Sequence, residues 1–140
     1  MAVYSLDKFV GLQTTKKVYK VCKNGKCLWD IFVSEIKRDG NLIGHLDSLS
    51  SILESAANGL MLPDTRWKHL KTPDKSIKIY EAKKDILRMY VYRDDRHGYL
   101  VVFGGKKNDQ KEDIKRLIQN AIEINSQEIL YINEDKQNVR

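Results

Sequence analysis

The stretch YEAKKDILRMYVYRDDRHGYLVVFGGKKND, residues 80–109, decides the fold. Apolar and polar residues alternate along most of it, and this period of two is typical of strands with one face in the core. Short polar segments interrupt the alternation. We therefore predict three strands, at residues 76–83, 86–92 and 99–104, joined by short links into an antiparallel unit.

The first turn of this unit is predicted at Lys84 and Asp85, in a register that places Glu81 opposite Arg88 and Lys83 opposite Ile86. Because successive side chains point to opposite faces of a strand, the residues divide into two sets. The core face is predicted to contain Leu87, Met89, Val91, Tyr80 and Ala82. The other face is predicted to be a cationic and aromatic surface that carries Glu81, Lys83, Arg88, Tyr90 and Tyr92. A purely structural interpretation of that second face is a cross-strand ion pair with tyrosines beside it.

The rest of the chain extends this unit into an α+β domain. Two apolar runs in residues 18–33 flank Asn24-Gly25, a dipeptide that favours a two-residue hairpin. Leucines at helical spacing predict a helix near residues 41–59, and a second amphipathic helix is predicted from 110 to about 130, with a capping box formed by Asp109 and Glu112. We expect a small twisted antiparallel sheet with helices packed on it. Residues 1–15 and 132–140 are expected to be peripheral.

Length and composition bound the kind of protein. A chain of 140 residues suits one domain, here taken as residues 1–140. No apolar run approaches the roughly 20 residues of a membrane span, and lysines interrupt the N-terminal region where a signal peptide would be apolar. A cytoplasmic location is therefore expected.

The positive charge is concentrated in one part of the chain. The segment from Lys68 to Arg116 contains 14 Lys and Arg against 8 Asp and Glu, which equals the whole net charge of +6. These cations either form solvated faces or bind phosphates, since neutralising phosphates releases counterions. The clustering alone leaves both interpretations open.

Two cysteines flank the predicted hairpin turn. Cys22 and Cys27 are symmetric about Asn24-Gly25 and should face each other, a geometry that allows a disulfide. A cytosolic setting disfavours that bond, and the three histidines are not spaced like metal ligands. We expect two reduced thiols, no bound metal and no cofactor.

The third strand of the opening stretch runs into Gly104-Gly105 and then Lys106-Lys107. This is not a phosphate-binding P-loop, whose pattern is Gly-x-x-x-x-Gly-Lys-Ser/Thr. It does place two lysines at the end of a strand beside the cationic face. The two glycines allow another backbone to approach closely.

In order and spacing, the motifs WKHLK, IYEAK, LRMYVYRD and YLVVFGGKK, followed by an amphipathic helix, resemble the RelE/ParE superfamily of bacterial toxins, nearest its HigB-like branch. The resemblance covers roughly residues 40–125. It implies the toxin of a type II toxin–antitoxin system, a metal-independent endoribonuclease that cleaves messenger RNA on the ribosome and inhibits translation. The 2′-hydroxyl would attack the adjacent phosphate and leave a cyclic phosphate. The implied partners are messenger RNA, the ribosome and an antitoxin, expected to be a helix-turn-helix protein.

The resemblance also implies roles for particular residues. Arg88 matches a family arginine and is assigned to the scissile phosphate, where fixed cations stabilise developing charge. Lys83 replaces the usual arginine and loses its two-pronged geometry, and Glu81 is a possible base or orients Arg88. The terminal lysine pair is matched by Lys106 and Lys107. The residues expected to hold RNA are Lys68, Lys71, Tyr90, Tyr92, Arg93, Arg96 and His97. Gly104 and Gly105 replace a common aromatic residue, which removes a base-stacking wall.

Two other functions stay open on the residues alone. The ParE branch of the superfamily inhibits DNA gyrase and lacks the catalytic cluster. A relative that binds RNA or protein without catalysis is the third possibility. Because Arg88 is expected to point away from the core face, replacing it by Ala is expected to leave the fold intact.

Overall fold

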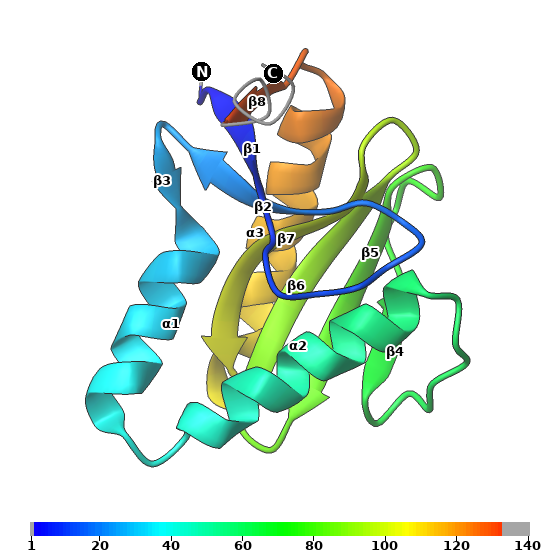
Figure 1. The fold of residues 1–140 in the computed structure, drawn as a ribbon. Helices are drawn as coiled ribbons and strands as arrows, with labels where there is room; N and C mark the ends of the chain where they lie inside the picture. The colour runs from blue at the N-terminus through cyan, green and yellow to red at the C-terminus, as the bar shows by residue number, and fades with distance from the viewer. Residues whose placement is uncertain (1, 133–140) are drawn as a thin grey trace.

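The computed structural model describes residues 2–132 as an α+β fold, in which an eight-stranded mixed sheet packs against three α-helices (Figure 1). The strands follow one another across the sheet in the order β4-β5-β6-β7-β2-β1-β8, and β3 pairs with β2 alone. The strands are β1 (Tyr4–Lys8), β2 (Val18–Lys23), β3 (Lys26–Cys27), β4 (Trp67–Leu70), β5 (Lys78–Lys84), β6 (Leu87–Asp94), β7 (Gly98–Lys106) and β8 (Leu130–Ile132). The helices are α1 (Leu28–Asp39), α2 (Ile43–Ala57) and α3 (Gln110–Asn125), and a short 3₁₀ turn, η1 (Lys107–Asp109), precedes α3.

The α+β class is confirmed, but the sheet is mixed rather than antiparallel. The unit β5-β6-β7 is antiparallel as predicted. In contrast, β2 runs parallel to β7, and β8 runs parallel to β1. Strand β2 can run parallel to β7 because the connection from β2 to β5 is long. That connection contains α1 and α2, and it returns the chain to the sheet on the side of β7 that faces away from β2.

The turn between β5 and β6 lies one residue later than predicted. Lys84 pairs with Leu87, so Asp85 and Ile86 form the turn, and Asp85 has a φ of +53°. Lys83 therefore lies opposite Arg88 rather than Ile86, and Glu81 lies opposite Tyr90 rather than Arg88. Because the shift in pairing is two residues, each side chain keeps its predicted face.

The predicted hairpin at Asn24-Gly25 forms, with positive φ at both residues, but its second strand has only two residues. The chain then enters α1 instead of continuing as a strand to residue 33. Trp29, Phe32 and Ile36 lie at helical spacing and are buried. The strand prediction was wrong there because a short apolar run does not distinguish a strand from a buried helix face.

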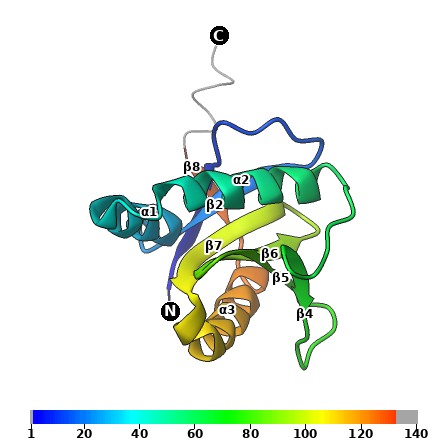
Figure 2. The same cartoon turned by 90° about the horizontal axis from the view of Figure 1, so that it is seen from below.

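The helices cover both faces of the sheet. Helices α1 and α2 lie on one face and α3 lies on the other (Figure 2). Both predicted helices are present, and Gly59, with a φ of +82°, follows the end of α2, but α3 ends at Asn125 rather than near residue 130, where β8 begins. Asp109 is at the N-cap of α3 but makes no side-chain cap hydrogen bond, so the predicted capping box with Glu112 is absent.

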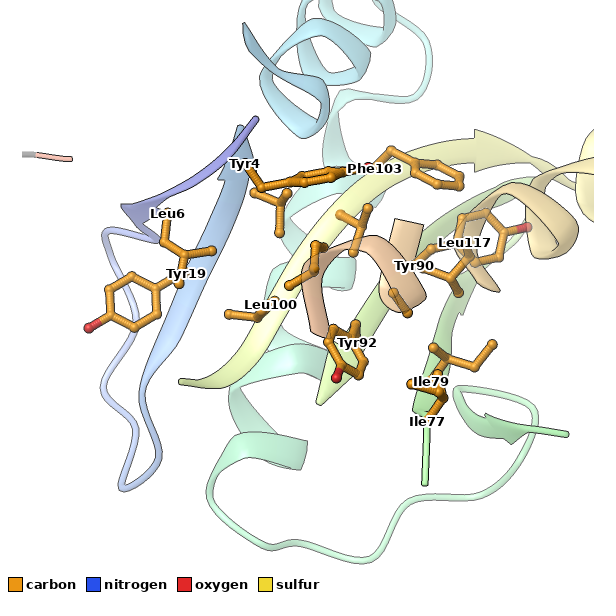
Figure 3. Close-up of a cluster of buried hydrophobic side chains, with 14 of the residues drawn as sticks. Tyr4, Leu6, Tyr19, Ile77, Ile79, Tyr90, Tyr92, Leu100, Phe103 and Leu117 are labelled. Atoms are coloured by element: carbon orange, nitrogen blue, oxygen red, sulfur yellow. The ribbon is translucent and has the colours of Figure 1, made fainter. Parts of the chain in front are cut away.

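Two hydrophobic clusters fill the two layers. The cluster beneath α1 and α2 includes Leu49, Leu53, Met89 and Val91. The cluster beneath α3 includes Tyr90, Tyr92, Phe103 and Leu117, and Figure 3 shows these side chains packed together. The face of β6 that was predicted to be a cationic surface is therefore a second core face. That part of the prediction was wrong, since α3 covers the face.

The N-terminal region is not peripheral. Strand β1 lies between β2 and β8, and its Tyr4 and Leu6 are buried under α3. The Tyr4 hydroxyl donates to Glu123 at 2.5 Å and accepts from Asn120 at 3.0 Å. The peripheral position expected for residues 1–15 is thus corrected, whereas residues 133–140 lie outside the described part of the chain.

Cys22 and Cys27 are directly opposite each other in the pairing of β2 with β3, as predicted. Their sulfurs are joined in a disulfide, so the expectation of two reduced thiols was wrong for this structure. Within residues 2–132 no helix is long and apolar enough to cross a membrane.

Candidate nucleic-acid interface

Glu81 is at the centre of the predicted catalytic cluster and is fully buried. Gln110, in the first turn of α3, donates to Glu81 Oε2 at 2.6 Å. Lys83 Nζ lies 3.7 Å from Oε1, and Arg88 Nε lies 3.8 Å from Oε2. The structure therefore brings Glu81, Lys83 and Arg88 together, but beneath the N-terminus of α3 rather than on a free surface.

Arg88 is only 6% exposed, and its guanidinium is directed to the turn at the end of the sheet. Nη1 donates to the carbonyl oxygens of Asp85 at 2.7 Å and Leu87 at 2.9 Å. Nε has no hydrogen-bond partner among the described residues, and the same holds for Glu81 Oε1. This buried pair thus has polar atoms whose hydrogen-bonding capacity is not used.

Tyr90 and Tyr92 do not form a base-stacking surface. Both side chains are buried beneath α3, and the Tyr92 hydroxyl donates to Asn125 at 3.3 Å. Burial and the nearby carboxylates of Glu81 and Asp113 raise the pKa of Tyr90. The role predicted for these two tyrosines in stacking on RNA bases is therefore contradicted.

The terminal lysines lie at the same end of the sheet as Arg88. Lys106 pairs with Leu87 in the register of β6 with β7, and the backbone N–H of Lys107 donates to Ile86 O at 2.8 Å. Both lysines are exposed. The predicted cations Lys83, Arg88, Lys106 and Lys107 therefore lie at one end of the sheet, with only Arg88 buried, but Lys106 shares the α1/α2 face with Leu87, whereas Lys83 and Arg88 lie on the α3 face.

The glycines before these lysines make room for side chains of this chain. A Cβ on Gly104 would lie 2.2 Å from the ring of Phe32 in α1, and a Cβ on Gly105 would lie 2.2 Å from an Asp113 carboxylate oxygen in α3. The glycine pair was predicted to admit another backbone, but the groups that approach it are side chains of the helices packed on the two faces.

Arg96 and His97 lie at the opposite end of β6. They bind Asp94, a buried carboxylate, with Arg96 Nη2 at 3.1 Å and His97 Nδ1 at 2.9 Å from Oδ2. Six residues separate Arg88 from Asp94, about 20 Å along a strand. Arg96 and His97 therefore hold the β6–β7 turn and do not converge with the Arg88 cluster.

The edge strand β4 carries an aromatic stack that sequence reasoning missed. The Tyr80 ring lies between two partners, Trp67 at 5.0 Å and His69 at 4.8 Å between ring centroids, with interplanar angles of 12° and 26°. His69 is exposed, whereas Trp67 and Tyr80 are half-buried against the core under α2. The segment WKHLK was not predicted to be a strand. The alternation of Trp67 and His69 within it could have indicated the aromatic stack.

Cations surround this aromatic stack, defined here as Trp67, Tyr80 and His69. Lys78 on β5 pairs with Arg93 on β6, and Tyr80 on β5 pairs with Val91 on β6. Because the two pairs are two residues apart along the strands, Lys78 and Arg93 lie on the same face of the sheet as Tyr80. Arg93 also lies over the Tyr99 ring, 5.5 Å from its centroid. Lys71, exposed just after β4, and Lys68, which pairs with Glu81 on the other face, complete the basic edge.

A scan against models of protein families, a search of curated proteins and a search of solved structures each found no match to this chain. Within residues 2–132 there is no group of three or more His, Cys, Asp or Glu side chains that could hold a metal ion.

Proposed function

We propose that the protein is an RNA-directed toxin of a type II toxin–antitoxin system, which acts in the cytoplasm on messenger RNA at the ribosome. The observation that carries this proposal is the aromatic stack on β4 and β5, because it combines accessible ring faces with adjacent cations. Single-stranded RNA is recognised by stacking unpaired bases on aromatic side chains and by neutralising the backbone. The motif order that resembles the RelE/ParE superfamily supports the toxin assignment.

The arrangement of the edge strand favours a single strand over a duplex. The exposed His69 ring lies at the outer end of the stack, where an unpaired base can continue it. Lys78 and Arg93 lie on the same face of the sheet, within reach of the phosphates that flank such a base. A paired base in a duplex presents its edge rather than its ring face, and so gains little from this surface.

Cleavage of the bound message is the catalytic part of the proposal. The scissile phosphate would contact the exposed Lys107 and the partly exposed Lys83, while Arg88 adds positive charge from beneath and Lys106 adds positive charge from the α1 face of the same strand end. A water molecule takes the proton of the 2′-hydroxyl, whose oxygen attacks the adjacent phosphorus. The bond to the 5′-oxygen breaks while the Lys107 ammonium donates a proton to that oxygen, which gives a cyclic phosphate and a 5′-hydroxyl. Glu81 orients Arg88 in this scheme, since its carboxylate is fully buried and bonded to Gln110.

A second candidate function is RNA binding without cleavage. The burial of Arg88 and Glu81 under the first turn of α3 favours it, because a group that stabilises a transition state must reach the reacting phosphate. The two candidates share the aromatic stack and differ at the Arg88 end of the sheet.

Binding to a single-stranded RNA of about ten nucleotides tests the shared part. His69→Ala, which removes the outer ring of the stack, and Trp67→Ala, which removes the ring at its other end, should each weaken binding roughly fivefold to a hundredfold, since stacking of a base on an aromatic ring contributes about 1–3 kcal/mol. Tyr131→Ala, at the opposite edge of the sheet and 36% exposed, is the matched control and should bind like the native protein. Equal affinity of the native protein and Trp67→Ala would contradict the proposed interface.

Mapping RNA 5′ ends after induced expression separates cleavage from binding. New 5′ ends within coding frames, absent from a Lys106→Ala/Lys107→Ala variant that still binds RNA, are expected for the endoribonuclease. Growth arrest with intact messages would favour the binder, and growth arrest with inhibited gyrase would favour the ParE-like alternative.

A further inference from the structure

The loop that joins β1 to β2, residues 9–17, crosses the fold on the side of α2 (Figure 1) and borders an open cavity of about 650 Å³. This cavity is at the end of the sheet opposite Arg88, since Tyr99 at the start of β7 donates its N–H to Lys17 O at 2.9 Å. It contains none of the residues to which a role in RNA binding or cleavage is assigned above.

The loop is fastened to the C-terminal end of α2. The N–H of Gln13 donates to Glu54 Oε2 at 2.7 Å, and the N–H of Thr15 donates to Asn58 Oδ1 at 2.7 Å. Asn58 Nδ2 returns a hydrogen bond to Gln13 O at 2.9 Å. Because both the N–H and C=O groups of the loop are held, the cavity is preformed rather than a gap left by an untethered segment.

The lining separates into an apolar part and a cationic part. Phe9, Leu12 and Val18 provide apolar surface. Lys8, Lys16 and Lys17 provide three positive charges, and Thr14 and Thr15 provide hydroxyl groups. No carboxylate lines the cavity, and none of the three ammonium groups has an ion-pair partner within residues 2–132. Three uncompensated cations beside one cavity create a strongly positive local potential.

We propose that this cavity binds a nucleoside phosphate, with the planar base against Phe9 and Leu12 and the phosphates among Lys8, Lys16 and Lys17. The volume lies within the roughly 300–1,000 Å³ that is usual for ligand pockets. An anion without an apolar part would leave the Phe9 side unused, and an apolar ligand without charge would leave the lysines uncompensated. The ligand is either a free nucleotide or the 5′-phosphorylated end of an RNA chain, since both carry the same chemistry.

Isothermal titration of the full chain with ADP, adenosine and inorganic phosphate tests the proposal. ADP should bind at least tenfold more tightly than adenosine or phosphate alone, because only ADP engages both parts of the cavity. The Lys16→Ala/Lys17→Ala variant should lose at least tenfold in ADP affinity. The control pair Lys26→Ala/Lys37→Ala removes the same charge from exposed positions elsewhere and should bind ADP normally.

Two short oligoribonucleotides, one with a 5′-phosphate and one with a 5′-hydroxyl, distinguish the sources of the phosphate. A preference for the phosphorylated chain over ADP assigns the cavity to an RNA end, and the reverse preference assigns it to free nucleotide. Absence of ADP and RNA-end binding, or an equal loss in the control pair, would overturn the proposal. The Trp67→Ala variant should retain ADP binding, so failure here is distinguishable from failure of the proposed RNA interface.

Discussion

The two ends of β6 both lie beneath α3 and both bury a carboxylate that an arginine contacts, but they differ in how completely the polar atoms are satisfied. At the Asp94 end, the Asp94 carboxylate accepts hydrogen bonds from the Arg96 backbone N–H and from two nitrogens of the Arg96 side chain, and it also contacts His97 Nδ1 at hydrogen-bond distance. Arg96 also donates to Ile124 O and to Gln127 O, both at 3.3 Å, and so joins the turn to the C-terminal end of α3.

At the Arg88 end, three buried polar atoms lack a hydrogen-bond partner among residues 2–132. They are Glu81 Oε1, Arg88 Nε and the Tyr90 hydroxyl. A satisfied buried cluster serves the fold, whereas unsatisfied buried atoms in a native protein call for a specific explanation. The comparison therefore indicates a structural role for Asp94 and leaves capacity for a ligand or a proton at the Arg88 end.

The largest expected effect is that of Arg88→Ala on stability. This change leaves the fully buried Glu81 with Lys83 as its only cationic neighbour among the described residues, and breaking a buried pair costs about 3–5 kcal/mol. The melting temperature should fall by roughly 10 °C or more. This outcome differs from the intact fold expected from sequence, because α3 covers the face on which Arg88 lies.

Lys84→Ala is the matched control for this measurement. Lys84 is the last residue of β5, is exposed and has no ion pair within residues 2–132. The melting temperature of the Lys84→Ala variant should stay within about 2 °C of that of the native protein. A native-like melting temperature for Arg88→Ala would mean that Glu81 is not held as an ion pair and would remove the contrast between the two ends.

The next effect concerns Asp94→Asn, expected to cost about 2 kcal/mol at pH 7, since hydrogen bonds to charged groups contribute about 1.5–3 kcal/mol. Burial opposes ionisation of Asp94, but the hydrogen bonds from Arg96 and His97 outweigh it and hold its pKa below the usual value. A carboxyl with a lowered pKa stabilises the fold above its unfolded pKa and loses that contribution as pH falls through the folded pKa. Urea denaturation from pH 7 down to pH 3 should therefore show the native protein approaching the stability of Asp94→Asn in acid.

Much of the framework was predictable because it depends on local patterns. Strands β5, β6 and β7 follow from alternation, and α2 and α3 follow from helical spacing. Strands β1, β4 and β8 have five, four and three residues, which is too short for a clear alternation, and β8 pairs with β1 from the other end of the described chain.

The candidate site was predictable in part for the same reason. Parity along β5 and β6 correctly placed Glu81, Lys83 and Arg88 on one face. Whether that face is exposed to solvent depends on where α3 packs. The tyrosines do not decide it, because tyrosine in a strand is compatible with a buried face as well as with an exposed one. The distinction therefore required the tertiary structure, and the aromatic stack with an exposed end proved to be Trp67, Tyr80 and His69, of which only His69 is exposed.

A smaller effect is expected where β7 meets α3. Gly105→Ala brings a Cβ against the Asp113 carboxylate, the end of a side chain that can move, and should cost about 1 kcal/mol. Gly104→Ala meets the packed ring of Phe32 on the other face and should cost about 2–3 kcal/mol, which makes it the comparison variant. Urea denaturation of the two variants measures the difference between their free energies of unfolding. Equal losses of stability would mean that the Asp113 side chain is as firmly held as the Phe32 ring.

The smallest effect, and the one that tests the contrast between the ends most directly, is that of Asp113→Asn. Burial raises the pKa of Asp113, and this outweighs the attraction of Arg116, whose Nη2 is 3.9 Å from Oδ1. A carboxyl with a raised pKa is penalised when it ionises, so the fold gains stability as pH falls through the folded pKa, the reverse of Asp94. Asp113→Asn should therefore stabilise the protein by less than about 1 kcal/mol at pH 7, and the gain should vanish near pH 3. If Asp113→Asn were instead destabilising at pH 7, the carboxylate would be making a favourable interaction at the N-terminus of α3, and burial would not dominate its ionisation.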